Sequence, residues 1–127
     1  MKISILTLFP EMYEGFLNTS IIKKARLKEL VEFEIVDIRA FTTNKHNRVD
    51  DYPFGGGQGL VMAIQPIDDA LKSIRNEKSR VLMASASGET LTQNKVRQLS
   101  AEEHLILLCG HYEGIDQRVM KLVDEEF

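Results

Sequence analysis

The chain has 127 residues, the usual size of one domain, and its 43% hydrophobic and 28% charged residues are ordinary for a globular protein. A net charge of −3 argues against a protein that binds nucleic acid by diffuse attraction alone, although it allows recognition by shape. The single cysteine, Cys109, excludes an internal disulfide, so we expect a reducing, cytoplasmic location and an inert thiol.

The first quarter of the chain predicts a strand followed by two helices. Residues 1–9 are almost continuously apolar and break at Pro10, which favours a strand buried on both faces; the segment is too short to span a membrane. A short helix through Phe16 and Leu17 should follow. Residues 18–20 offer cap side chains for a second helix over 21–30. We expect its lysines outside and these apolar residues inside: Ile21, Ile22, Ala25 and Leu27.

The next segment alternates and then becomes irregular. Residues 31–38 predict a second strand nearer an edge of the sheet, whereas residues 39–59 show almost no periodicity, and an irregular stretch of this length is usually functional or disordered. Its glycine run could form a nest of backbone amides for an anion or act as a flexible hinge. No Gly-Lys-Ser/Thr follows, so this is not a Walker loop.

The remainder alternates between strand and helix patterns. Residues 60–64 are expected to return to the core. A helix is predicted over 65–74, with Asp68 and Asp69 in its first turn, where their negative charges interact favourably with the helix dipole. Strands are predicted over 80–84 and 105–109, and helices over 92–99, capped by Thr92, and over 116–123. Residues 124–127 resemble neither a natural helix end nor a tail. This alternation predicts an α/β fold with a mostly parallel sheet and helices on both faces.

Two turns of small residues follow buried strands. Ser85-Ala86-Ser87-Gly88 follows the third strand, and a loop bounded by Gly110 and Gly114 follows the fourth. Ligands of open α/β sheets bind outside the carboxyl ends of the strands, so both turns are candidate binding loops.

Two groups of basic residues and three histidines are weaker signals. Either basic group, taken alone, is better explained as a solvated surface. The histidines lack metal-ligand spacing, so we expect no metal site. The basic groups are Lys23, Lys24, Arg26 and Lys28, and then Arg39, Lys45, His46 and Arg48; the remaining histidines are His104 and His111.

Three separated stretches resemble the bacterial tRNA (guanine-N(1)-)-methyltransferases. They are LTLFPEM at residues 6–12, VDDYPFGGGQGL at 49–60 and CGHYEGIDQR at 109–118. The resemblance covers the whole chain. It implies a SPOUT-type methyltransferase domain with a trefoil knot, S-adenosyl-L-methionine as cofactor, a homodimer, no membrane, and tRNA as partner, methylated at N(1) of the guanosine 3′ of the anticodon.

The resemblance also implies site residues. Ala86 stands where the family usually has proline, and the carboxylate of Glu113 could meet the cationic end of the cofactor. Lys45 and Arg118 are further candidates for phosphate contacts. The implied cofactor residues are Ser85, Ala86, Ser87, Gly88, Gly110, Tyr112, Glu113 and Gly114, and the implied substrate residues are Asp50, Gly55, Gly56, Gly57, Gly59 and Arg48.

The third cofactor loop, the general base and the C-terminal tRNA-binding domain of the family would follow Phe127. The resemblance therefore implies that residues 1–127 are an incomplete N-terminal cofactor-binding domain, truncated before the knot closes. We expect this domain alone to be inactive and to bind the cofactor weakly at best. Two alternatives remain open: a non-catalytic nucleotide- or RNA-binding α/β domain, and a scaffold that dimerises through its glycine loop.

Overall fold

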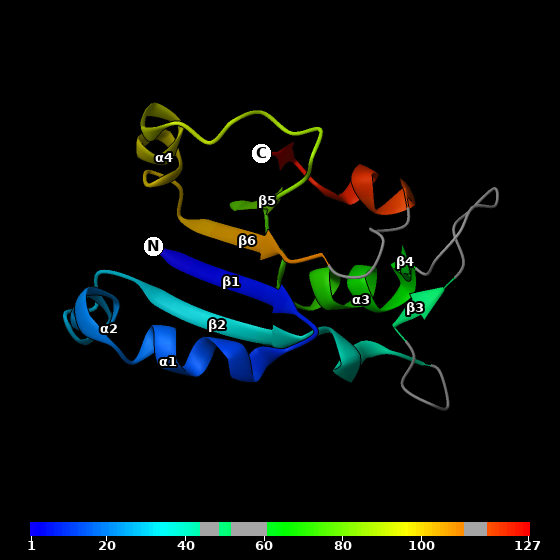
Figure 1. Cartoon of the computed structure of the whole chain (residues 1–127), viewed down its shortest axis with the longest axis horizontal. Helices are drawn as coiled ribbons and strands as arrows, with labels where there is room; N and C mark the ends of the chain where they lie inside the picture. Colours follow the sequence, from blue (N-terminus) through cyan, green and yellow to red (C-terminus); the bar gives the residue numbers. More distant parts are fainter. Residues whose placement is uncertain (44–48, 52–60, 111–116) are drawn as a thin grey trace.

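A five-stranded parallel sheet lies at the centre of the computed structural model, which describes residues 1–43, 49–51, 61–110 and 117–127 (Figure 1). The strands run in the order β2-β1-β6-β5-β7. Their bounds are β1 Lys2–Thr7, β2 Glu32–Asp37, β5 Ser79–Met83, β6 His104–Leu108 and β7 Glu125–Glu126. A separate antiparallel pair joins β3, Asp50–Asp51, to β4, Val61–Met62. The parallel sheet and the edge position of β2 were both predicted from the sequence and are confirmed.

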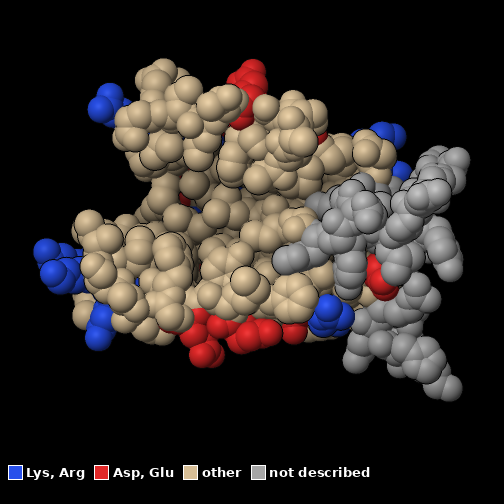
Figure 2. All heavy atoms as spheres, viewed as in Figure 1, with Lys and Arg blue, Asp and Glu red and all other residues tan. Residues whose placement is uncertain are grey.

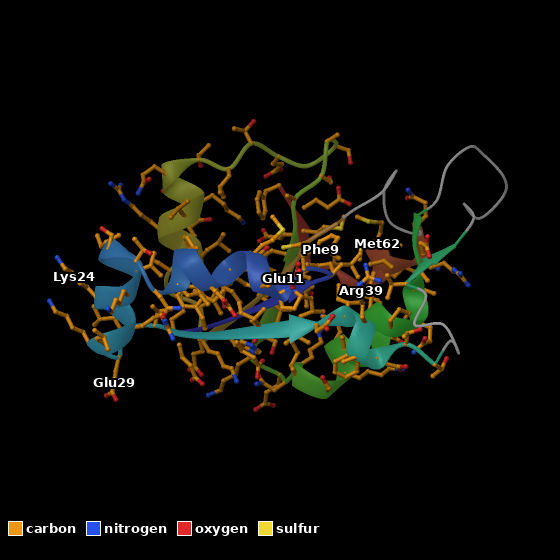
Figure 3. All side chains as sticks on the ribbon, turned by 60° about the horizontal axis from the view of Figure 1, so that its bottom comes forward. Phe9, Glu11, Lys24, Glu29, Arg39 and Met62 are labelled. Carbon is orange, nitrogen blue, oxygen red and sulfur yellow. The ribbon has the colours of Figure 1, made fainter. Side chains whose placement is uncertain are left out.

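Helices cover both faces of the sheet, as the alternating pattern predicted. In Figure 3, α3 lies on the opposite side of the sheet from α1 and α4. In the described part of the chain, no helix is both long and apolar enough to span a lipid bilayer. The α-helices are α1 Glu14–Leu17, α2 Ser20–Leu27, α3 Ile64–Ile74 and α4 Gln93–Leu99, and the 3-10 helices are η1 Pro10–Tyr13, η2 Ile38–Phe41 and η3 Gln117–Leu122.

The main core lies between the sheet and α3. Alternate strand residues face α3, because successive side chains of a strand point to opposite faces. They pack against Ile67, Ala70 and Leu71 of α3, all of which are buried. The residues that the sheet and its strand ends contribute are Leu6, Leu8, Val36, Ile38, Val81, Met83, Ile106 and Leu108.

The second helix, α2, differs from its prediction. It ends at Leu27 rather than at residue 30, and Ile21 and Leu27, expected inside, are each 74% exposed. Eight residues offer only a narrow contact stripe, so Ile22 and Ala25 are half-buried and nothing in α2 is fully buried. Its predicted caps serve α1 instead, since the Thr19 hydroxyl donates to the Gly15 carbonyl oxygen at 2.6 Å.

A Schellman turn ends α2. The N–H of Glu29 donates to the Arg26 carbonyl, and the N–H of Leu30 donates to the Ala25 carbonyl. This geometry places Glu29 in the left-handed region with φ of 58°, a position that usually belongs to glycine because a Cβ is strained there.

A chain of buried and half-buried polar side chains crosses four strands on the α3 face. The His104 Nδ1 lies 2.7 Å from the Ser79 hydroxyl and its Nε2 lies 2.8 Å from the Ser4 hydroxyl. Ser4 donates to Glu34 at 2.8 Å, so its oxygen accepts from Nε2–H. The pKa of His104 is lowered by burial, which favours a neutral imidazole whose Nδ1 accepts from Ser79, and His104 is a structural residue.

Beyond the predicted elements, the structure contains the short strand β7. Arg80 of β5 and Lys95 of α4 both contact the Glu125 carboxylate, and Arg80 lies 3.0 Å from it. These two cations hold the pKa of Glu125 at about 2, below its ordinary value of 4.5. The ion pairs fix a two-residue strand that has too few backbone hydrogen bonds to persist alone.

We predict that Glu29→Gly stabilises the protein by about 0.5–1 kcal/mol, because glycine adopts the left-handed conformation without strain. Urea unfolding at neutral pH measures this change. Glu29→Ala is the matched control, since it removes the same carboxylate but keeps the Cβ. Equal stability of the two variants would contradict a strained Glu29.

A second prediction concerns the pH dependence of stability. Burial lowers the pKa of His104 below its ordinary value of 6.5, and Lys2 lowers it further, while Glu34 opposes both. As the pH falls through 6.5 toward the folded-state pKa, the unfolded chain takes up the proton first, so the free energy of unfolding decreases. Unfolding in urea between about pH 8 and about pH 5 should show this loss. The loss should be smaller in His104→Gln; equal losses in both proteins would refute the assignment.

Candidate functional site

The carboxyl ends of the parallel strands meet at one edge of the sheet. Leu6 of β1 pairs with Leu108 of β6, which in turn pairs with Met83 of β5, so these strands end level with one another. The arrowheads of β1, β2 and β6 point toward β3 and β4 (Figure 1). The two small-residue turns predicted as binding loops begin at this edge, after the neighbouring strands β5 and β6.

The turn after β5 is fixed by residues of and beside β7. The Ser85 and Ser87 hydroxyls both donate to the Glu126 carboxylate, at 2.8 and 3.1 Å. The Ser85 N–H donates to the Phe127 carbonyl at 2.8 Å. The backbone N–H groups of Ala86 and Ser87 make no hydrogen bond to the described residues, and both residues are exposed. Hydrogen bonds to Glu126 and Phe127 thus hold the turn, while two of its backbone donors have no partner in the described part of the chain.

Gly88 closes this turn and must be small. A Cβ built on Gly88 would lie 2.6 Å from the backbone N and C of Phe127. No real side chain tolerates that distance to backbone atoms, so glycine permits the chain after β7 to lie beside the turn.

The exit of β6 brings Cys109 and Gly110 to the same edge. The N–H of Cys109 donates to the Leu6 carbonyl at 3.0 Å, which extends the pairing one residue beyond β6. Cys109 is half-buried, and its Sγ lies 3.2 Å from the Tyr13 hydroxyl. Burial and this contact raise the pKa of Tyr13 to about 12, so the phenol stays neutral. Gly110 is exposed, immediately after this anchored residue.

Asp50 lies in the stem of the β3–β4 hairpin and is half-buried, opposite Met62. The neighbouring Val49 is buried, and its carbonyl accepts from the Ala63 N–H at 2.7 Å. The part of the chain predicted as irregular therefore contains η2 and β3. The core position of Met62 confirms that the chain returns to the core after the glycine run.

Several predicted site residues lie outside the described residues. The roles predicted for these residues, and for Lys45, His46 and His111, therefore stay predictions. The cofactor residues in this group are Tyr112, Glu113 and Gly114, and the substrate residues are Arg48, Gly55, Gly56, Gly57 and Gly59.

Asp68 and Asp69 have roles within α3. Asp68 forms an ion pair of 2.9 Å with Lys72, and Asp69 accepts a hydrogen bond from Gln65. These contacts agree with the prediction that both are helix charges.

The first basic group lies away from this edge. Figure 3 shows Lys24 of α2 and Glu29, which follows α2, at one end of the molecule, away from Arg39 and Met62. Figure 2 likewise shows lysine or arginine atoms gathered at the α2 end. Arg26 uses its guanidinium within the fold, donating to the Leu17 carbonyl at 2.6 Å. The placement supports a solvated helix surface for this group.

Sequence patterns missed Glu126 and Phe127, which shape the turn after β5. A three-residue acidic run followed by one aromatic residue carries no strand periodicity. The available signal was the pair of serines at 85 and 87, because the hydroxyl of Ser85 is half-buried and needs an acceptor.

The described residues fit part of a nucleotide-like cofactor site. The backbone N–H groups of Ala86 and Ser87, which have no partner among the described residues, and the exposed Gly110 are features that can bind the polar edge of a fused-ring ligand. Beside them, a cavity of about 240 Å³ lies between the 89–92 segment, α4 and β7. It is smaller than the roughly 300–1,000 Å³ typical of ligand pockets. This cavity is therefore too small to enclose such a ligand by itself.

Comparisons with known proteins agree with the resemblance seen in the sequence. Residues 1–127 match the family model described as tRNA (Guanine-1)-methyltransferase TrmD. Proteins named tRNA (guanine-N(1)-)-methyltransferase from Bacillus cereus strain AH820 and Bacillus anthracis strain A0248 are each 52% identical over 130 residues, covering 99% of this chain. The chain spans 53% of the length of these relatives.

A solved structure shares the fold. The crystal structure of a tRNA (m1G37) methyltransferase from Aquifex aeolicus superposes with a TM-score of 0.85 at 36% sequence identity, over 99% of this chain and 58% of that one. The family match over the full chain, the identity to the bacterial relatives and this superposition lead to one conclusion: the chain belongs to the tRNA (guanine-1)-methyltransferase TrmD family.

Proposed function

We propose that this chain is the cofactor-binding part of an enzyme that transfers a methyl group from S-adenosyl-L-methionine to N(1) of the guanosine 3′ of the anticodon in tRNA. The observation that carries the proposal is the pair of small-residue turns at the ends of the adjacent strands β5 and β6. Membership of the TrmD family supports the reaction.

The residues of this chain would hold and orient the cofactor. The backbone N–H groups of Ala86 and Ser87 would donate to the adenine edge, and Gly110 and Gly114 would allow the second loop to approach closely. Tyr112 and Glu113 complete the proposed cofactor set, with the Glu113 carboxylate near the cationic methionine end. When bound, S-adenosyl-L-methionine supplies an activated methyl group for in-line transfer.

The tRNA side of the site is proposed at the β3–β4 hairpin and the glycine run. Asp50 and Arg48, with Gly55, Gly56, Gly57 and Gly59, would contact the target nucleotide. We further propose that the protein is a cytoplasmic homodimer. Its third cofactor loop, general base and C-terminal tRNA-binding domain would lie in the sequence that follows Phe127.

The direct test is methyl transfer by the full-length protein to undermodified tRNA, with product analysis for N(1)-methylguanine. We expect activity in the wild type and a loss of at least about tenfold in Glu113→Ala, because a charge-assisted contact to the cofactor is removed. Binding of tRNA or nucleotide without methyl transfer would favour a binding domain. Dimerisation without either would favour a scaffold.

A further prediction tests the turn after β5. Gly88→Ala should destabilise the protein by about 1–3 kcal/mol and weaken binding of S-adenosylhomocysteine, because its Cβ would displace the backbone of Phe127. Isothermal titration and urea unfolding measure the two effects.

Gly15→Ala is the matched control for this substitution. A Cβ at Gly15 meets nothing within 4 Å, so the variant should bind the cofactor normally. If Gly88→Ala behaved like Gly15→Ala in both measurements, the close approach of Phe127 would have no role in the site.

A further inference from the structure

Phe9 and Arg39 form a stacked pair at the carboxyl edge of the sheet. The guanidinium carbon of Arg39 lies 5.8 Å from the centroid of the Phe9 ring (Figure 3). Phe9 follows β1 and Arg39 follows β2, two neighbouring strands whose last paired residues are Thr7 and Asp37. Phe9 is 36% exposed and Arg39 is half-buried, so solvent reaches the pair.

The backbone of each partner is anchored. The N–H of Phe9 donates to the Thr7 hydroxyl at 3.1 Å, and the Phe9 carbonyl accepts from Met12. The N–H of Arg39 donates to the Asp37 carboxylate at 2.9 Å, where η2 begins. Both side chains thus extend from fixed positions, and the Arg39 guanidinium lies over the Phe9 ring within the range of a cation–π contact.

The charge of Arg39 is not neutralised within the described residues. Arg75 pairs with Asp124, and Arg80 pairs with Glu125. The Arg39 guanidinium, in contrast, forms no ion pair or hydrogen bond in the described part of the chain, although Asp37 is two residues away. The Asp37 carboxylate instead caps η2 through the backbone N–H.

We propose that Arg39, oriented by Phe9, binds a backbone phosphate of the RNA substrate. A guanidinium stacked on an aromatic ring presents paired N–H donors that match two phosphate oxygens. The location supports this role, because β1 lies next to β6 and the pair therefore flanks the strand that leads into the candidate cofactor loop at Gly110. The inference rests on the proposed function, since it names a contact for the same tRNA.

The test measures affinity of the full-length protein for undermodified tRNA at several salt concentrations. We expect Arg39→Gln to lower the affinity about tenfold, because a hydrogen-bonded charge contact is lost. The slope of log affinity against log salt should become shallower by about 0.7–0.9, the value for one phosphate contact. Affinity for S-adenosylhomocysteine should not change.

Three further variants sharpen the experiment. Arg97→Gln removes an exposed arginine from α4 and should behave as the wild type. Arg39→Lys should retain the salt slope but lose affinity, because an ammonium group cannot stack or bind in the paired manner. Phe9→Leu should weaken tRNA binding less than Arg39→Gln does. It should also keep the wild-type slope of log affinity against log salt, because this substitution removes only the aromatic ring and leaves the charge. The last two variants also preserve the test if Arg39→Gln fails to fold.

Two results would overturn this inference while leaving the proposed function intact. In one, Arg39→Gln binds tRNA with the affinity and salt slope of the wild type. In the other, Arg39→Gln loses affinity for S-adenosylhomocysteine, while the slope of log tRNA affinity against log salt stays that of the wild type. The guanidinium would then contact the cofactor instead of tRNA. A wild-type protein that binds S-adenosylhomocysteine but neither binds nor methylates tRNA would overturn the proposed function itself.

Discussion

The parallel pairing of β6 between β1 and β5 is the constraint on which the remaining structure depends. This pairing aligns the ends of three strands and so brings residues from distant parts of the sequence to one edge. Parallel neighbours cannot be joined by a tight turn, so each connection must cross a face of the sheet. The helices between the strands provide those crossings and bury the apolar residues of both faces.

The two ends of the sheet have different chemistry. At the amino end, Ser79, His104, Ser4 and Glu34 form a closed chain of hydrogen bonds that leaves the imidazole neutral. At the carboxyl end, the backbone donors of Ala86 and Ser87 and the guanidinium of Arg39 make no polar contact with the described residues. Polar groups that already form hydrogen bonds within the protein stabilise its fold, whereas exposed N–H donors without such a partner can bind a ligand. This contrast is the physical reason for assigning function to the carboxyl end.

Short-range patterns predicted much of this arrangement. The apolar runs at β1, β5 and β6 and the alternation at β2 indicated the strands, because burial on one or both faces imposes these patterns directly. The turns after β5 and β6 were predicted to be binding loops from their small residues, and the structure places both at the carboxyl edge of the sheet. Helix α2 was predicted too long, since a periodic apolar pattern does not reveal that a left-handed residue at Glu29 ends the helix.

The sequence by itself determined the α/β class, the main strands, the position of both candidate cofactor turns and the family resemblance. Each of these depends on neighbouring residues or on a contiguous motif. Only the tertiary structure decided that Glu126 accepts from Ser85 and Ser87, that Gly88 faces Phe127, and that Arg39 stacks on Phe9. These pairs are separated by about 30 to 41 residues. Their contact follows from strand order and register, which local periodicity does not encode.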